Sequence, residues 1–428
     1  MLQAIDPTRT FGAHVYSLTD HIEASCTADI FVDDLMATRA KLSWPLLGKI
    51  SQKEFLARYW QKKPLLIKGA FKPFPEIISP EELAGMTLDK KVESRLIIQG
   101  PGKKDWQLKR GPFTSSTFQK LPKKKWTFLV NGVDRFVPSV HAFLEEFSFI
   151  PFWRMDDIMI SYAVDQGNVG AHVDNFDVFL VQAAGNREWM IEDKPVMKDD
   201  FIPDLPVRLL KKFKPTHRWV LEPGDILYLP PRFPHHGVAQ GDRCMTISVG
   251  CRAPSTNEII NGVVTNALIQ SDDSARYTDP DLMPQAPGQI SPHAIAKIRK
   301  TLENVLLSDE FLSEWLGRHV TDPYSDVDLK GHAEKIAPGK VAATVRRSIA
   351  IVRTEGSRLA YVKGKKGEIA FYVNGDRENL SGKAALLAQE LANRLVVPSE
   401  AITPFLGDKK CLGLLASLLS AGALVVES

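Results

Sequence analysis

Cysteine, net charge and long apolar runs are all scarce in this chain of 428 residues. The four cysteines, Cys26, Cys244, Cys251 and Cys411, have no paired spacing, so neither a disulfide framework nor a zinc site is expected. No apolar run approaches the ~20 residues that a membrane span requires. The N-terminal residues lack a basic start and an apolar signal core. These absences predict a cytoplasmic protein with no membrane partner.

The formal net charge is only +3, so the chain as a whole has no strong attraction to nucleic acid. One local stretch is basic, and Asp105 is its only acidic residue. Such a run is usually a solvated face; contact with RNA or another polyanion is the alternative. Its members are Lys103, Lys104, Lys109, Arg110, Lys120, Lys123, Lys124 and Lys125.

A possible metal motif stands in the middle of the chain, at His172-Val173-Asp174. Residues i and i+2 of an extended chain point the same way, so His172 and Asp174 can face one ion. A histidine pair, His235 and His236, follows about sixty residues later. Two histidines and one carboxylate on one face of a non-haem Fe(II) leave three coordination positions open, as an oxygenase requires.

A lone His-x-Asp is common by chance, but the sequence around this one supports a metal-binding role. Residues 158–164 and 177–182 are β-rich runs on either side of the pair. Before His235 the chain makes a Pro-Gly turn at 223–224 and then places prolines at 230, 231 and 234. Proline fixes φ and removes a donor, so this approach is a rigid platform rather than an ordinary central strand.

Local patterns predict the other elements. Helices are expected at 51–63, 79–88, 139–147, 256–268, 293–318, 381–395 and 410–421. Strands are expected at 65–67, 92–99, 106–109, 126–131, 360–362, 369–373 and 423–426, and residues 158–253 are expected to be strand-rich throughout. Residues 340–352 fit a strand followed by a helix or a helical lead.

Four segments together resemble a known family: residues 55–67, 153–161, 170–179 and 248–254. They are similar to the Jumonji-C-type cupin oxygenases and, within these, to the bacterial ribosomal oxygenases, which hydroxylate an arginine of a large-subunit ribosomal protein. The resemblance runs from about residue 45 to the C-terminus. The metal motif alone is shared by many oxygenases, whereas the combination of segments is much more specific.

The resemblance implies an α+β fold in which a double-stranded β-helix barrel of the cupin type precedes two further parts. We expect an N-terminal extension at 1–44, the catalytic domain at 45–254, a helical dimerisation segment at 255–330 and a winged-helix-like domain at 331–428. The helical segment could instead pack on its own barrel. The helix expected at 410–421 has few polar residues able to read bases, so no specific DNA binding is expected.

The resemblance also implies the site and its cofactors. It selects His235 over His236 as the ligand that joins His172 and Asp174 on Fe(II), with 2-oxoglutarate and O2 as co-substrates. Arg187 stands where the family holds the distal carboxylate of 2-oxoglutarate, and Ser161 matches a position that hydrogen-bonds the same molecule. A surface arginine and a satisfied core hydroxyl are the alternatives for these two residues.

Other polar residues flank the motif. Asp165 and Gln166 lie just before it, where a carboxylate at the mouth would suit a cationic arginine substrate; a solvated loop is the alternative. Asn175 and Asp177 are expected to hydrogen-bond around the metal, and Trp189 is expected to fill core.

Three other functions stay open. A demethylase would use the same metal ligands, and some relatives modify histidine rather than arginine. A non-oxygenase metal cupin, or a regulator whose winged helix reads DNA, is also compatible with the motif.

Overall fold

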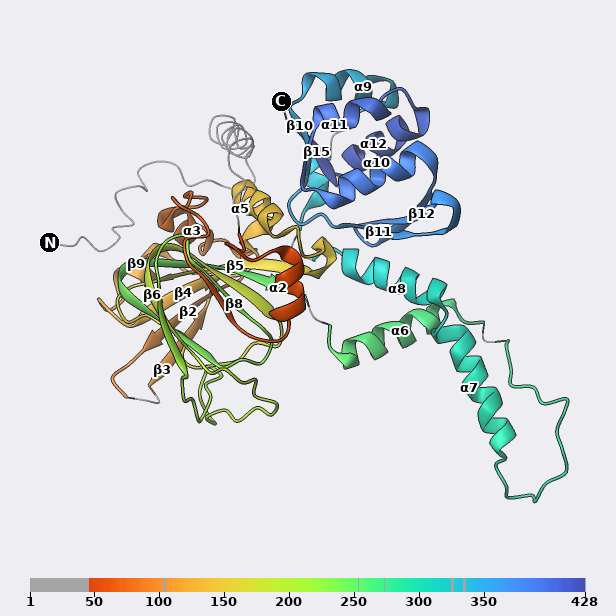
Figure 1. The fold of residues 1–428 in the computed structure, drawn as a ribbon, viewed down its shortest axis with the longest axis horizontal. Coiled ribbons are helices and arrows are strands. Elements are labelled where there is room, and N and C mark those ends of the chain that lie inside the picture. Colours follow the sequence, from red (N-terminus) through yellow and green to blue (C-terminus); the bar gives the residue numbers. More distant parts are fainter. Residues whose placement is uncertain are drawn as a thin grey trace. The chain divides into compact units, whose positions relative to one another are not determined.

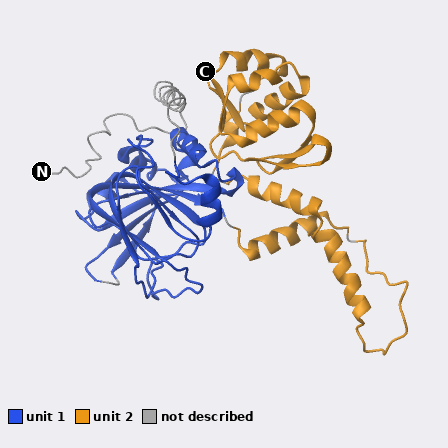
Figure 2. Ribbon diagram, viewed as in Figure 1, with its two compact units in different colours: residues 1–253 blue, residues 254–428 orange. Residues whose placement is uncertain are grey.

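The computed structural model describes residues 46–102, 105–252, 254–272, 274–324, 327–333 and 336–427. The expected N-terminal extension, Cys26, Lys103 and Lys104 therefore lie outside the described residues. The chain divides into two compact units, residues 1–253 and 254–428 (Figure 2). Among the described residues, no helix is both long and apolar enough to cross a membrane.

The first unit is built on a nine-stranded antiparallel sheet that curls into a barrel (Figure 1). The strand order is β1-β8-β6-β9-β5-β4-β2-β3, and β7 pairs with β6. The strands are β1 (Leu65–Ile67), β2 (Ser94–Gln99), β3 (Trp106–Arg110), β4 (Trp126–Val130), β5 (Met155–Ala163), β6 (Asp177–Ile191), β7 (His217–Leu221), β8 (Ile226–Leu229) and β9 (His235–Cys251).

Two long strands, β6 and β9, form the backbone of the barrel. They pair from Asp177↔Cys251 to Ile191↔His235, so the start of β9 lies beside the end of β6. Side chains alternate between the two faces of a strand, and both faces of this sheet are largely covered. Val181 of β6 and Ile247 of β9 are fully buried on one face, and Val178 and Leu180 of β6 are buried on the other.

Short helices flank the barrel. They are α2 (Gln52–Arg58), α3 (Pro80–Met86), α4 (Ser115–Gln119) and α5 (Pro138–Phe143). Helix α3 begins as predicted at Ser79, whose side chain accepts from Glu82 N–H while the Glu82 carboxylate accepts from the Ser79 backbone. Phe55 of α2 is fully buried and packs on Tyr228, with ring centroids 4.9 Å apart. Helix α2 thereby covers the β8 side of the barrel.

One prediction fails inside the barrel. Residues 192–216, which we call the strap, join β6 to β7 without forming a strand; only the bridge Phe201↔Leu210 interrupts an irregular course. The strap contains prolines at 195, 203, 206 and 215. Proline cannot donate to a strand ladder, so this stretch is strand-poor although the residues on both sides are strands.

The second unit begins with α6 (Thr256–Gln270), α7 (Pro292–Leu306) and α8 (Asp309–Thr321). The single helix expected at 293–318 is wrong, because the chain breaks at Leu307 and restarts with Ser308 as the N-cap of α8. Helix α8 packs on the sheet that follows: Arg318 Nη1 donates to Gly375 O at 2.8 Å, and Arg377 Nη1 lies 2.8 Å from Glu314 Oε2.

The rest of the second unit combines helices with two three-stranded sheets, β14-β10-β15 and β11-β12-β13. Strand β13, which the sequence did not predict, is polar and follows a turn at Asn374-Gly375. The elements are α9 (Pro338–Arg347), β10 (Ala350–Arg353), β11 (Leu359–Lys363), β12 (Ile369–Val373), β13 (Asp376–Leu380), α10 (Gly382–Asn393), β14 (Val396–Pro398), α11 (Ser399–Ile402), α12 (Lys409–Ser420) and β15 (Leu424–Glu427).

Candidate metal centre

The structure brings the three predicted metal ligands together. His172 lies on the connection between β5 and β6, and His235 is the first residue of β9. The two backbones form a bridge in which each N–H donates to the other's carbonyl at 3.0 Å. Asp174, two residues after His172, projects to the same place. His172, Asp174 and His235 are a group able to hold a metal ion within the described part of the chain.

The distances suit one ion. Asp174 Oδ2 lies 4.0 Å from His172 Nε2 and 3.5 Å from His235 Nε2. Metal–ligand bonds of about 2.1 Å at right angles separate neighbouring ligand atoms by about 3 Å. Small side-chain rotations would therefore close all three atoms on one ion.

Both imidazoles are oriented by backbone carbonyls. His172 Nδ1 lies 3.0 Å from Gly170 O, and His235 Nδ1 lies 2.9 Å from Phe233 O. A proton on each Nδ1 leaves each Nε2 with a lone pair facing Asp174. Burial, with His172 close by, lowers the pKa of His235 to about 4. His235 is thus neutral at physiological pH, as a metal ligand must be.

The second histidine of the pair, His236, points elsewhere. Its Nε2 lies 3.2 Å from Asn168 Oδ1, and its ring meets Phe213 edge-on. Burial lowers its pKa to about 4 as well. Successive side chains of a strand face opposite sides, and here that alternation directs only His235 toward Asp174.

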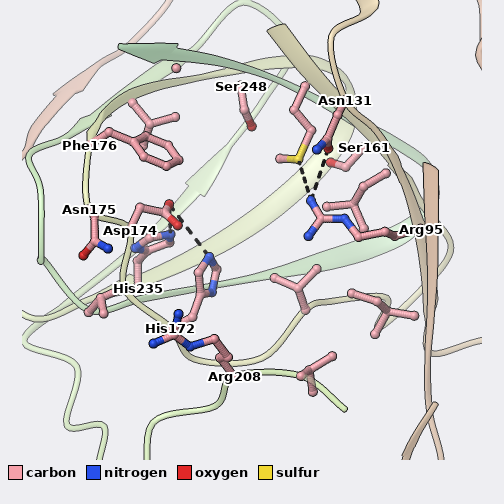
Figure 3. A pocket seen from close by; sticks show the side chains of 18 of the residues that line it. Arg95, Asn131, Ser161, His172, Asp174, Asn175, Phe176, Arg208, His235 and Ser248 are labelled. Atoms are coloured by element: carbon pink, nitrogen blue, oxygen red, sulfur yellow. Dashed lines mark hydrogen bonds and ion pairs between the residues drawn. The ribbon is translucent and has the colours of Figure 1, made fainter. Parts of the chain in front are cut away.

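The three residues open onto a cavity of about 560 Å³ inside the barrel. Figure 3 shows His172, Asp174 and His235 on one wall, with Arg95, Asn131 and Ser161 across from them. Apolar side chains from β2, β4, β5 and β6 fill in the walls, among them Ile97, Leu129, Met159, Val178, Leu180 and Trp189. A mostly apolar cavity with a few convergent polar groups is the usual form of a small-molecule site.

Arg187 is nearly fully buried, at 3% exposed. Its Nε and Nη2 have no hydrogen-bond partner among the described residues. The residue does not belong to the described cavity lining, but it lies two positions before Trp189, which does, on the same face of β6. A buried cation without a partner is costly, so these free donors fit an anion that enters from the cavity.

Ser161 lines the cavity, and its hydroxyl makes only a long bond, 3.4 Å, to Thr246 O. Thr246 is itself held by Gln182, whose Oε1 accepts from Thr246 Oγ1 at 3.0 Å. The Ser161 hydroxyl can therefore turn toward a ligand at little cost, as a co-substrate contact needs.

Asp165 and Gln166 do not belong to the described cavity lining. The Asp165 carboxylate lies 3.0 Å from Lys124 Nζ and accepts from Gly241 N–H at 3.1 Å. The hydrogen bond from Lys124 is the main cause that lowers the pKa of Asp165. Their expected contact with substrate stays a prediction, and a substrate cation would have to replace Lys124.

The expectation for Asp177 is wrong. It is fully buried and faces away from the metal ligands, accepting from Tyr228 Oη at 2.5 Å and Gln61 Nε2 at 2.9 Å. Asn175 does line the cavity and accepts from Arg232 Nη1 at 2.9 Å. Trp189 is buried as expected, yet it also faces the site, with its ring centroid 5.8 Å from that of His235.

Several polar residues at the cavity were not predicted. Arg95 Nη2 donates to Asn131 Oδ1 at 3.2 Å, and Arg95 has no carboxylate partner among the described residues. Arg208 and Asp199 come from the strap, and Arg232 from the proline-rich approach to His235. Arg95, the strap residues and Arg232 come from segments far apart in sequence, so no local pattern could have grouped them. Only Arg232 could have been noticed in the sequence, because it is a charged residue within the proline-rich approach to His235.

Family comparisons agree with this geometry. The JmjC domain family matches residues 142–259, which include all three candidate ligands. A family described as the ROXA-like winged helix matches residues 300–425.

Similar proteins cover most of the chain. The ribosomal protein uL16 3-hydroxylase of Escherichia coli K12 is 33% identical over 90% of this chain and 98% of its own length. A probable ribosomal oxygenase of Haemophilus influenzae is 30% identical over 80% of this chain and 85% of its own.

A solved structure of the E. coli ribosomal oxygenase YcfD, in complex with cobalt and 2-oxoglutarate, superposes with a TM-score of 0.74. It is 31% identical and covers 89% of this chain and 99% of that one. The resemblance drawn from the sequence is therefore confirmed, and the chain belongs to the ribosomal oxygenases, JmjC-domain proteins with a ROXA-like winged helix.

Proposed function

We propose that this chain is an Fe(II)- and 2-oxoglutarate-dependent oxygenase that hydroxylates a side chain of a large-subunit ribosomal protein. One observation carries the proposal: a group of two histidines and one carboxylate faces a cavity of about 560 Å³ in a JmjC barrel. The similar YcfD structure holds cobalt and 2-oxoglutarate, which supports a metal ion and 2-oxoglutarate as the molecules bound at this site.

His172, Asp174 and His235 would hold the metal on one face and leave three positions for 2-oxoglutarate and O2. When bound, Fe(II) supplies the activation of O2 that inserts one oxygen atom into a C–H bond while 2-oxoglutarate is converted to succinate and CO2. The protein's part is to orient the ligands through the carbonyls of Gly170 and Phe233. The apolar cavity walls keep bulk water from the reacting centre.

Arg187 and Ser161 would receive the distal carboxylate of 2-oxoglutarate. A guanidinium grips a carboxylate with two parallel hydrogen bonds, and two of the Arg187 nitrogens are free for this among the described residues. The Ser161 hydroxyl, with its long bond to Thr246, can add a third.

We propose uL16 as the substrate and carbon 3 of an arginine side chain as the position of attack. The choice of uL16 and of carbon 3 follows from the name of the E. coli relative. The choice of arginine follows from the family resemblance. The substrate guanidinium would take the place of Lys124 on Asp165, close to Gln166. Ribosomal proteins are made in the cytoplasm, which is where the sequence predicts this chain to act.

Intact mass spectrometry tests the activity. Purified uL16 is incubated with the enzyme, Fe(II), 2-oxoglutarate and ascorbate, with His172→Ala as the control. A gain of one oxygen, mapped to carbon 3 of an arginine and absent from the control, is the expected result. Loss of a methyl group would identify a demethylase, and an added oxygen on histidine would correct the residue type.

An unchanged uL16 would make a wider search necessary. The same incubation with all large-subunit ribosomal proteins then decides the substrate class. If none of them changes although the enzyme binds iron, the ribosomal assignment falls, and the small-molecule cupin and the regulator become the better interpretations.

We also propose that α6 and α7 form a homodimer interface. Helix α7 has no buried residue, and its apolar side chains repeat at heptad-like spacing. Ile298 is 53% exposed and Leu302 51% exposed, and on α6 Ile260 is 53% exposed. Such a stripe is self-complementary, so a second copy of the chain is the partner that fits it.

The double variant Ile298→Glu, Leu302→Glu tests this interface. It is expected to be a monomer by light scattering, against a dimeric wild type. A dimer that persists in the variant contradicts this interface.

A further inference from the structure

The strap contacts the loop that carries His172 and Asp174 at the start of that loop. Leu210 N–H donates to Ala171 O at 2.9 Å, immediately before His172. Gly170 has a φ of +82°, and a Cβ added there would lie 2.2 Å from Leu209 Cδ2. The strap therefore packs directly on the residues that precede the first candidate ligand.

The strap is tied to the other end of the same loop through Arg232. Arg232 N–H donates to Asp174 O at 2.7 Å, and Arg232 Nη1 donates to Asn175 Oδ1 at 2.9 Å. On the strap side, Arg232 Nε donates to Val196 O and Val196 N–H donates to Arg232 O, both at 2.9 Å. Arg232 Nη2 is paired with the Asp199 carboxylate.

The backbone of Arg232 makes this position unusual. Its φ is +71°, a region where Cβ crowds the neighbouring carbonyl and which favours glycine. An arginine at such a position needs compensation from its surroundings, and here the compensation consists of bonds to two other segments. Arg232 also lies only three residues before His235, so its conformation directs the chain that delivers this ligand.

We propose that Arg232, clamped by Asp199, is a positioning residue for the metal site and that the strap is part of the support of that site. The planar guanidinium can serve a carboxylate, an amide oxygen and a carbonyl at once, in a fixed geometry that lysine cannot copy. Through these bonds it holds the Asp174–Asn175 backbone against the approach to His235. Groups that orient metal ligands typically change metal affinity by about 10–100-fold when removed.

This inference rests on the metal site of the proposed function, so the test measures metal binding without substrate. The full-length protein is titrated with Co(II), and its visible absorption is followed. Arg232→Gly removes the side chain at a φ that glycine accepts, and Asp199→Asn removes the clamp but keeps the backbone of Arg232. Asp200→Asn is the matched control, because Asp200 lies on the same strap and pairs with exposed Lys211 at 2.8 Å.

We expect the Kd for Co(II) to rise about tenfold in Arg232→Gly and about threefold in Asp199→Asn, with altered cobalt absorption bands in both. Asp200→Asn should match the wild type. If Arg232→Gly fails to fold, Asp199→Asn still decides the question.

Two negative results are distinguishable. A wild type that does not bind Co(II) overturns the proposed metal site itself. A wild type that binds, with wild-type affinity and bands in both folded variants, overturns only the positioning role and shows that these bonds merely hold the strap.

Discussion

Among the residues that the structure describes, each of the two units buries one arginine, and the two arginines differ in their hydrogen bonds. Arg187 in the barrel and Arg353 in the C-terminal unit are both 3% exposed. Arg353 Nη2 donates to three carbonyls at the end of α10, those of Leu391, Ala392 and Arg394, at 2.8, 2.9 and 3.0 Å. Arg187 leaves Nε and Nη2 without a partner among the described residues.

The two arginines differ in how the protein compensates their charge. A buried charge is tolerated when hydrogen bonds and an opposite charge or dipole compensate it. The carbonyls at a helix C-terminus carry partial negative charge, so the end of α10 compensates the charge of Arg353 within the unit. The barrel offers Arg187 no such partner among the described residues, and an anionic ligand would supply it. The C-terminal unit therefore bonds Arg353 to its own backbone, whereas the barrel leaves two donors of Arg187 that the proposed function assigns to 2-oxoglutarate.

The largest effect is expected for Arg187→Met. Two charge-assisted hydrogen bonds to 2-oxoglutarate would be lost, so kcat/KM for 2-oxoglutarate should fall about a thousandfold, or about 4 kcal/mol. Because Nε and Nη2 of Arg187 have no hydrogen-bond partner among the described residues, the free energy of unfolding should not fall. Steady-state kinetics and urea unfolding measure the two quantities. A variant that loses stability but keeps its 2-oxoglutarate dependence would reverse the comparison.

The opposite pattern is expected for Arg353→Met. Three carbonyls lose a charged donor, so the free energy of unfolding should fall by about 3 kcal/mol. The kinetics of molecules that remain folded should be unchanged. Arg394→Met is the control, since Arg394 is half exposed and pairs only at the surface with Glu390, and it should cost less than about 0.5 kcal/mol. Equal losses in the two variants would contradict the structural role of Arg353.

Asp134 extends the comparison to a buried acid of the barrel. Burial, and then the nearby Asp157, raise the pKa of Asp134 from 3.8 to about 7. The folded protein thus holds this proton more tightly than the unfolded chain, so its stabilising contribution is complete below pH 4 and is lost as the pH rises to about 7.

Asp134→Asn should remove this pH dependence, because an amide still accepts from Ile158 N–H but cannot ionise. Relative to the wild type, the variant should gain about 2 kcal/mol of stability between pH 4 and pH 6. Urea unfolding at both pH values measures the gain. A constant difference between the two proteins would show that Asp134 titrates normally.

The smallest effect is expected for Ser161→Ala. One neutral donor to 2-oxoglutarate is lost, so KM for 2-oxoglutarate should rise about fivefold, or about 1 kcal/mol. Thr246→Ser, which keeps a hydroxyl to bond Gln182, should leave KM nearly unchanged. An unchanged KM in Ser161→Ala would assign the hydroxyl to the core.

The two regions also differ in how far the sequence predicted them. In the C-terminal unit, helices α10 and α12 were placed nearly to their ends, because their apolar periodicity is strong and uninterrupted. The polar strand β13 was missed because its pairing with β12, rather than its own composition, makes it a strand. In the barrel the strap was not predicted, because its prolines stand singly within residues 158–253, most of which have strand-forming composition.

The sequence by itself identified His172 and Asp174 as candidate ligands and, through the resemblance, the family and the choice of His235 over His236. These are local patterns, which can be recognised in the sequence without knowing the fold. Only the tertiary structure decided that His172 and His235 bridge each other, that Asp177 faces away from the site, and that Arg232 joins the strap to the ligand loop. Those facts depend on pairing register and on contacts between distant segments. Because a shift of one residue in a strand reverses every side chain on it, they become fixed only when the barrel closes.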